Sequence, residues 1–281
     1  MINRSYKSWS LFQYILIVLT VVFISCEEQK RVIEPFIPSG ERVVLLEEFT
    51  GKGCNNCPKG SREIENLLTL FPDNLVAVSI HAGHFADPGS FPLGIYDLRS
   101  PQHQEILELL SPIIGYPTAA VNRVVFNGDI QLPRNQWSSA ISSQLATAPA
   151  IDLGITKEYN SDTRELLVAV SGIGKQPLTG DIRLSIMLTE SGIIDAQRDQ
   201  DAPVELVEDY VHNHVLRDMM TPAAGATILN SITTGQTFNH SYTITLDETW
   251  NPQNMEIIAF VSNVEGGSKA VLQAKSIHLA D

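Results

Sequence analysis

The chain has 281 residues, a length that favours about two domains. Hydrophobic residues make up 43% and charged residues 18%, so the chain can bury ordinary cores and is not a disordered acidic tail. Acidic residues outnumber basic ones by 32 to 19, and the net charge of −13 argues against a nucleic-acid binder, which would carry a basic surface. Three cysteines are too few for a fold built on disulfides.

The N-terminus has the pattern of a bacterial export signal. Arg4 and Lys7 precede an apolar run over 11–25, which is shorter than the roughly 20 residues that a transmembrane helix needs. The run ends in FISC, and this ending resembles a lipoprotein signal in which Cys26 receives lipid and becomes the mature N-terminus. We therefore predict a signal peptide over 1–25. The alternatives are an uncleaved membrane anchor, or ordinary cleavage that leaves Cys26 as a free thiol.

The residues after the signal predict where the protein is held. Glu27 and Glu28 resemble the surface-export signal of lipoproteins in Bacteroidota, although acidic residues also occur in solvated linkers. The segment 26–40 is polar and contains two prolines, which predicts a tether. We expect a cell-envelope protein that is anchored by lipid on the periplasmic or the cell-surface face.

Strands and helices alternate over 41–148. Residues 43–46 and 75–80 are continuous apolar runs, which are typical of strands buried on both faces. Residues 82–100 are rich in glycine, proline and aspartate and predict a loop, and Asn127-Gly128 predicts a hairpin turn. This alternation, ended by a hairpin, predicts an α/β layer around a mixed sheet. The other predicted elements are helices over 57–70, 101–110 and 133–145 and a strand over 118–126.

The pattern changes at Ala148-Pro149. From there on, hydrophobic and polar residues alternate along short runs that turn residues separate. Short strands at this spacing predict a β-sandwich over 149–281. Residues 191–235 depart from the alternation and predict a long, partly helical excursion. The predicted strands are 151–158, 165–171, 182–189, 238–246, 256–262 and 270–278.

The sequence Cys54-Asn55-Asn56-Cys57 carries the strongest chemical signal. It follows a predicted buried strand and opens a predicted helix, which is the context of a redox CxxC motif. The unpaired N–H groups and the positive end of a helix favour a thiolate over a thiol. Cys54, at the exposed edge, is the predicted nucleophile. Cys57, one turn inside the helix, is predicted to resolve the mixed disulfide.

Two further features resemble thioredoxin-like proteins. Tyr116-Pro117-Thr118 precedes a predicted strand, as does the loop that places a cis-proline beside the CxxC in that family. The resemblance implies a cis Pro117 whose neighbours, Tyr116 and Thr118, bind an extended substrate. Glu48 lies six residues before Cys54, where thioredoxins carry a buried acid that accepts or relays the proton of the resolving thiol. A glutamate here takes the place of that family's aspartate.

The wider resemblance is to the Omp28-related outer-membrane lipoproteins of Bacteroidota. It implies fold and location more strongly than reaction. The expected fold class is an α/β thioredoxin-like domain at 41–148, followed by an all-β, Ig-like sandwich domain at 149–281. The resemblance rests on the β-rich second half and on EEFTG at 47–51, CNNCP at 54–58, GYPT at 115–118 and the stretch 208–217.

Other interpretations of the same residues stay open. The 54–57 pair could be a purely structural disulfide in an oxidising envelope, and a zinc half-site would need a second ligand pair that the cysteines cannot supply. Paired histidines and alternating aspartates could bind a metal, but strand-end histidines and solvated loops are favoured. We therefore expect no metal and no cofactor. The residues in question are His81, His84, His212, His214, Asp195, Asp199 and Asp201.

These motifs together predict thiol–disulfide exchange on extracytoplasmic proteins. The expected partners are protein thiols or disulfides, an unidentified redox partner and the membrane through the lipid anchor, with no nucleic acid. The alternative is a non-catalytic surface binding or adhesion lipoprotein in which the 54–57 disulfide is structural. The β-rich half favours that alternative, whereas the CxxC and the GYPT loop favour exchange.

Overall fold

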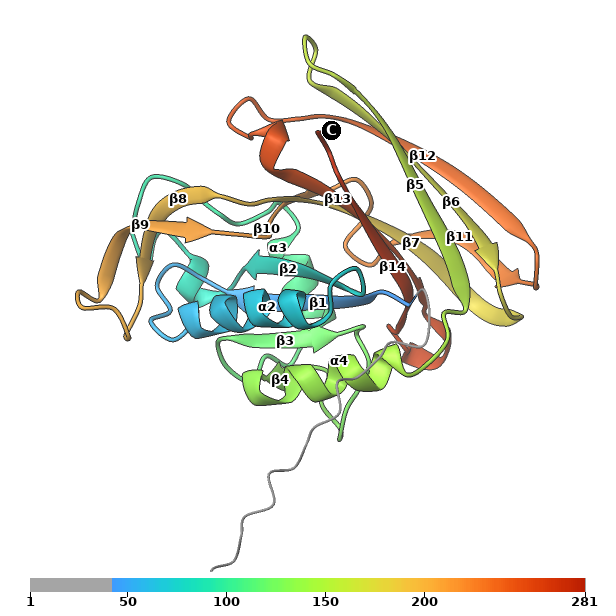
Figure 1. Ribbon diagram of the computed structural model, residues 1–281, viewed down its shortest axis with the longest axis horizontal. Coiled ribbons are helices and arrows are strands. Elements are labelled where there is room, and N and C mark those ends of the chain that lie inside the picture. The colour runs from blue at the N-terminus through green and yellow to red at the C-terminus, as the bar shows by residue number, and fades with distance from the viewer. Residues whose placement is uncertain (1–41, 281) are drawn as a thin grey trace, which may run out of the picture. The chain divides into compact units, whose positions relative to one another are not determined.

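The computed structural model describes residues 42–280 (Figure 1). Its central strands are β1 (Val44–Thr50) and β2 (Leu75–His81), which are parallel and are connected by α2 (Pro58–Leu70). Every residue of both strands is buried, including the polar residues that follow the apolar run of β1. Three predictions fall outside the described residues: the signal peptide over 1–25, the tether over 26–40 and the lipidated Cys26.

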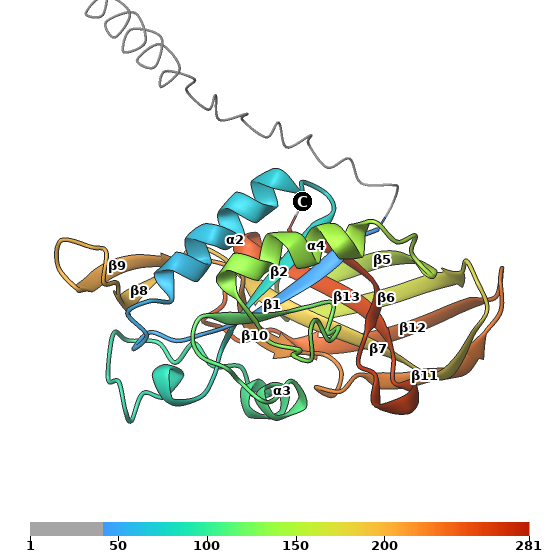
Figure 2. The ribbon, with the colours of Figure 1, turned by 90° about the horizontal axis from the view of Figure 1, so that it is seen from below.

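Helices cover both faces of the sheet around β1. On one face, α2 and α4 (Trp137–Leu145) pack against β1 through aliphatic side chains and Trp137. On the other face lies α3 (His103–Leu109), and Figure 2 shows the sheet between these two layers. The edge next to β1 is completed by β3 (Thr118–Val121), which is antiparallel to β1, and by β4 (Leu132–Pro133).

One mixed sheet runs through both halves of the chain. The second half contributes β7 (Leu178–Glu190), β10 (Val215–Met219), β11 (Ala226–Ile232), β13 (Met255–Asn263) and β14 (Val271–His278). The strand order is β14-β13-β7-β10-β2-β1-β3-β4, and β11 also pairs with β7. Because β10 is parallel to β2 and antiparallel to β7, it connects the two halves.

A second sheet packs on the first. It consists of β5 (Ile151–Asn160), β6 (Glu165–Gly174) and β12 (Thr237–Thr245), in the order β12-β6-β5. Alternate residues of β6 are buried, as its period-two pattern predicts. Together with β7 and β13, these strands enclose an aliphatic core that includes Val168 and Leu184.

A two-stranded hairpin follows β7 and consists of β8 (Ile193–Arg198) and β9 (Leu206–His212). Figure 1 places it at the side of the molecule where β1 and β2 end. The prediction of a partly helical excursion over 191–235 is wrong, since these residues form β8 to β11 and no helix. The register shifts within the β8–β9, β10–β7 and β11–β7 pairs, and such irregularities interrupt the strict alternation that identifies strands in a sequence.

The expected fold class, an α/β thioredoxin-like domain followed by an all-β sandwich, is wrong. Strands account for 44% and helices for 17% of the structure, which is therefore mostly β. The large sheet contains strands from before and after Ala148-Pro149 in the sequence, and all described residues fall within one compact unit. The physical reason lies at β2, whose outer edge would expose unpaired backbone groups unless β10 covered it. Local periodicity reports which face of a strand is buried but not which strand lies beside it.

Candidate redox site

The candidate site lies where β1 ends and α2 begins. Cys54 and Cys57 form a disulfide, with their Cα atoms 5.4 Å apart. Cys57 is the N-cap residue of α2 and Pro58 occupies the first turn, so the disulfide lies at the positive end of the helix dipole. Cys54 is only 3% exposed and Cys57 only 1%. The prediction that Cys54 stands at an exposed edge is therefore wrong, because other segments of the chain cover it.

Glu48 is a fully buried carboxyl group beside the first turn of α2. Burial raises its pKa to about 8, and the hydrogen bond that it accepts from the Ser79 hydroxyl at 3.2 Å only partly opposes this rise. Its Oε1 atom has no hydrogen-bond partner among the described residues. A Cβ atom on Gly60 would lie 2.1 Å from this oxygen, so only glycine lets α2 approach so closely. At neutral pH the carboxyl group is largely protonated and can donate a proton.

Pro117 borders the same turn of α2. The Tyr116–Pro117 peptide bond is cis, as the resemblance implied. A Cβ atom on Gly60 would lie 2.8 Å from Cβ of Pro117, which places the proline next to the turn that contacts Glu48. Glu48 and Pro117 thus meet at Gly60, one turn into the helix whose N-cap residue is the disulfide-bonded Cys57.

The two neighbours of Pro117 use their side chains within the fold. The Tyr116 hydroxyl donates a hydrogen bond of 3.0 Å to the Ala82 carbonyl, and burial raises the pKa of Tyr116. The Thr118 side chain is fully buried, and its hydroxyl donates a hydrogen bond of 3.0 Å to the Leu132 carbonyl. Only their backbone groups and the exposed part of the Tyr116 ring are therefore free of side-chain contacts within the fold.

An aromatic cluster of His84, Phe85, Phe91 and Tyr116 lies beside the disulfide loop. Phe91 contacts His84 and Phe85 at centroid distances of 5.2 and 5.7 Å, and Phe85 lies 5.5 Å from Tyr116. A Cβ atom on Gly53, the residue before Cys54, would lie 2.3 Å from the Phe91 ring. The cluster therefore closes one side of the disulfide loop.

The β8–β9 hairpin closes another side of the disulfide loop. The backbone N–H of Arg198 donates to the Lys52 carbonyl at 3.0 Å, and that of Gln200 donates to the Asn55 carbonyl at 2.9 Å. The side-chain amide of Gln197 donates to the carbonyl of Cys54 at 3.0 Å. The hairpin thus binds the backbone on both sides of Cys54.

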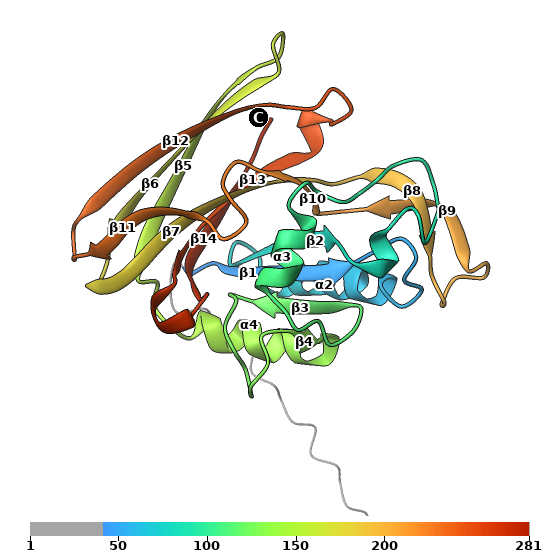
Figure 3. The ribbon, with the colours of Figure 1, turned by 180° about the vertical axis from the view of Figure 1, so that it is seen from behind.

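A buried ion pair fixes the base of this cover. Lys52 Nζ lies 2.8 Å from Asp195 Oδ2, and both side chains are almost fully buried. Asp195 also accepts hydrogen bonds from the backbone amides of Ile95 and Tyr96, so it ties β8 to the loop before α3. Burial disfavours the ionised form of Asp195, but the hydrogen bonds from Lys52 and the backbone outweigh it and lower the pKa. Figures 1 and 3 show this loop running beside β8.

The histidines and aspartates considered as metal ligands have other surroundings. His81 and His212 are buried with ring centroids 5.5 Å apart, and burial lowers the pKa of both, that of His212 to about 4. Asp199 and Asp201 form ion pairs with Arg62 of α2. In residues 42–280 no group of three or more histidine, cysteine, aspartate or glutamate side chains is placed to hold a metal ion.

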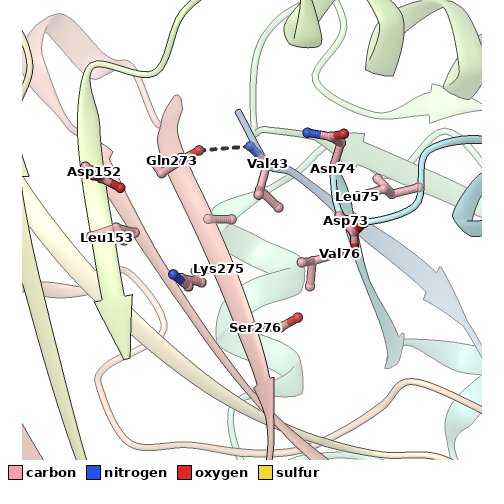
Figure 4. A pocket seen from close by; sticks show the side chains of 11 residues that line it. Val43, Asp73, Asn74, Leu75, Val76, Asp152, Leu153, Gln273, Lys275 and Ser276 are labelled. Carbon is pink, nitrogen blue, oxygen red and sulfur yellow. Dashed lines mark hydrogen bonds between the residues drawn. The ribbon is translucent and has the colours of Figure 1, made fainter. Parts of the chain in front are cut away.

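A pocket of about 710 Å³ opens at the opposite end of β1 (Figure 4). Residues of β5 and β14, including Asp152 and Lys275, line one side of it, and the N-terminal ends of β1 and β2 line the other. The backbone N–H of Val43 donates to Gln273 at its rim. Because β1 spans seven residues, roughly 20 Å separate this pocket from the disulfide loop, so the pocket is not part of the candidate redox site.

Most contacts around the disulfide could not be predicted from the sequence. Asp195 and Lys52 are 143 positions apart in the sequence, and no local pattern relates the two. The alternating aspartates at 195, 199 and 201 did mark an unusual segment, for which we predicted a solvated loop. Their actual role is to hold the hairpin to Lys52 and Arg62.

The fold and these contacts define a β-rich protein with a covered disulfide at a helix N-terminus. The family model described as outer membrane protein Omp28 matches residues 111–280, and the chain belongs to this family of outer-membrane lipoproteins. The protein is thus located at the outer membrane. The matched range begins after Cys57 and does not include the disulfide. Within residues 42–280, no helix is both long and apolar enough to cross a membrane.

Solved structures resemble the chain at low sequence identity. Protein AGR_C_4864 from Agrobacterium tumefaciens has a TM-score of 0.51 and 12% identity, and the similarity covers 86% of this chain and 97% of that one. A domain of the outer membrane lipoprotein Omp28 from Porphyromonas gingivalis has a TM-score of 0.30 and 19% identity, covering 47% of this chain and 88% of that one. No curated protein matches the sequence. At 12% identity, the similarity to the Agrobacterium tumefaciens protein concerns the fold alone.

Proposed function

We propose that this outer-membrane lipoprotein exchanges thiols and disulfides with extracytoplasmic proteins through Cys54 and Cys57. The observation that carries the proposal is the disulfide at the N-terminus of α2, one turn from the contact between Gly60 and protonated Glu48. A helix N-terminus favours a thiolate, and a protonated carboxyl group nearby can supply the proton that a leaving thiolate takes up. We assign Pro117, with the backbone of Tyr116 and Thr118, to client binding.

The exchange step uses the cysteine pair and Glu48. A client thiolate attacks Sγ of Cys54 and forms a mixed disulfide, while the Cys54–Cys57 bond breaks and Cys57 leaves as a thiolate. The Glu48 proton passes to Cys57, and solvent later reprotonates Glu48. A second thiolate of the client then attacks the client sulfur of the mixed disulfide and releases Cys54. The client loses two electrons and the cysteine pair gains them. The reverse sequence, starting from the reduced pair, reduces a client disulfide.

Cys57→Ser should accumulate mixed disulfides with client proteins, because it removes the thiol that resolves them. Cys54→Ser should not, because it removes the thiol that attacks the client disulfide. Cells that express each variant would be quenched with acid, and their proteins separated without reductant and blotted. Adducts that are equally abundant in both variants, or absent from both, would contradict the assigned roles.

The burial of the disulfide favours a second candidate function. Cys54 and Cys57 are almost inaccessible, as expected for a structural bond in a binding or adhesion lipoprotein. In that case the bond would stabilise the loop beneath the hairpin and take no part in chemistry. The redox potential of the pair separates the two functions, because structural disulfides resist reduction.

We also propose that lipid attached to Cys26 anchors the protein. Cys26→Ser should abolish lipid labelling, because lipidation of this residue requires its sulfur, and should move the protein from the membrane to the soluble envelope fraction or leave an uncleaved precursor. Labelling with radioactive palmitate followed by fractionation measures both effects. Cys54→Ser serves as the control and should label like the wild type. Full labelling of Cys26→Ser would place the lipid elsewhere.

A further inference from the structure

The hairpin contacts the disulfide loop in the manner of an extended peptide. Within the segment 197–200, the backbone amides of Arg198 and Gln200, two residues apart, donate to the carbonyls of Lys52 and Asn55. Donors on alternate residues are what one edge of a β-strand presents. The segment therefore donates to carbonyl groups on both sides of Cys54, which belong to the turns that follow β1.

Side chains of the same segment add specific contacts. The Gln197 amide is nearly fully buried and donates to the Cys54 carbonyl, in addition to a longer contact of 3.4 Å with the Gly51 carbonyl. The Arg198 guanidinium lies over the Phe91 ring, 5.5 Å from its centroid. A cation over an aromatic face is attracted by the ring electrons. The aromatic cluster thus provides a place for a basic side chain next to Cys54.

The outer part of the hairpin is held by weaker contacts than its base. Asp199 and Asp201 pair with Arg62 at 2.8 and 2.7 Å, and Lys59 lies 3.4 Å from Asp201. These pairs are partly exposed, so each contributes little and salt screens it. The Lys52–Asp195 pair at the base is buried and is screened much less. The segment 197–200 can therefore open locally while the base of the hairpin stays attached.

We propose that residues 197–200 are an internal pseudosubstrate, a segment that occupies the part of the client-binding position formed by the carbonyl groups on both sides of Cys54 until a client displaces it. This inference rests on the proposed exchange function. It assigns to that function a client class: extended segments that offer backbone N–H groups on alternate residues and a basic side chain to Phe91. It also explains how a chemically competent disulfide can be buried in the resting protein.

The hairpin can be removed at the point where its two ends meet. Glu190 of β7 and Val215 of β10 are paired neighbours. Between them, the Gly192 amide donates to Asn213 Oδ1 and the His214 amide donates to Ser191 Oγ, both at 3.0 Å. Deleting residues 193–212 and joining Gly192 to Asn213 leaves a four-residue turn between strands that already pair.

The test measures the rate constant for reduction of the Cys54–Cys57 disulfide in the folded, full-length protein. Dithiothreitol should reduce the deletion variant at least about 10-fold faster than the wild type, because local opening no longer limits access. The milder variant Asp199→Asn/Asp201→Asn should be reduced severalfold faster at low salt, and added sodium chloride should narrow its difference from the wild type. Asp181→Asn, which breaks an ion pair with Arg183 away from the hairpin, is the matched control.

A second probe tests the client class. Two dithiol peptides, which differ only in an arginine or a glutamate beside the attacking cysteine, would reduce the deletion variant, and the arginine peptide should react several times faster. Equal rates for the two peptides would overturn the pseudosubstrate proposal. A deletion variant that unfolds cooperatively, and is therefore folded, but is reduced at the wild-type rate would overturn it as well. If the deletion accelerates reduction but Cys57→Ser traps no client with or without the hairpin, the exchange function fails and the hairpin is a shield for a structural bond.

Discussion

Glu48→Gln should remove a large part of the pH dependence of stability between about pH 5 and pH 8. The pKa of Glu48 in the folded protein, about 8, lies above its ordinary value of 4.5, because burial disfavours the carboxylate. The favourable contribution of this group is therefore fully present below about pH 4.5 and is lost as the pH rises towards 8. For this shift, the loss by pH 7 is about 3 kcal/mol of the free energy of unfolding.

Urea unfolding of the oxidised protein at several pH values measures this effect. The free energy of unfolding of Glu48→Gln, relative to that of the wild type, should rise steadily between pH 5 and pH 8. Glu158→Gln, which alters an exposed glutamate on β5, is the control and should follow the wild-type curve. Parallel curves for Glu48→Gln and the wild type would mean that Glu48 is already ionised in the folded protein, and it could then not donate a proton to Cys57.

Arg123→Met should lower the free energy of unfolding by about 3–5 kcal/mol. The Arg123 guanidinium donates to both oxygens of Glu47 on β1, at 2.8 and 2.6 Å, and both side chains are at most 2% exposed. It also lies 4.8 Å from the centroid of the Phe260 ring on β13. Removing the cation leaves the Glu47 carboxylate buried without a partner. The pair therefore connects the helix-covered part of the large sheet to the strands of the second half.

Chemical denaturation of the single and double variants measures this coupling. Glu47→Leu/Arg123→Met should recover much of the lost stability, because apolar residues can replace a buried ion pair at little cost. Asp181→Asn, at a partly exposed ion pair, should change the free energy of unfolding by about 1 kcal/mol or less. A cost below 1 kcal/mol for Arg123→Met alone would show that Glu47 and Arg123 are solvated and do not hold the two halves together.

Local patterns in the sequence located most elements and the cysteine pair. The apolar run at 75–80 matches β2, and the alternating run at 165–171 lies within β6. The turn at Asn127-Gly128 has positive φ angles at both residues and lies between Phe126 and Asp129, which form a β-bridge. These features follow from the properties of neighbouring residues, and such properties can be read without knowledge of distant contacts.

Long-range contacts explain what the sequence did not predict. Val215 pairs with Ser79 across 136 positions, and this pairing merges two expected domains into one sheet. The burial of Cys54 depends on Gln197 and Arg198, which approach from a hairpin whose register shifts between Asp195 and Gln197. Hydrophobic periodicity within one segment carries no information about such partners.

The redox potential of the Cys54–Cys57 pair tests the exchange function most directly. The folded protein would be equilibrated with dithiothreitol or glutathione buffers of known potential, and the fraction of reduced pair measured by alkylation and mass spectrometry. We expect a potential between about −270 and −120 mV, the range of proteins that exchange disulfides. A potential below about −300 mV would contradict the proposal and mark the bond as structural.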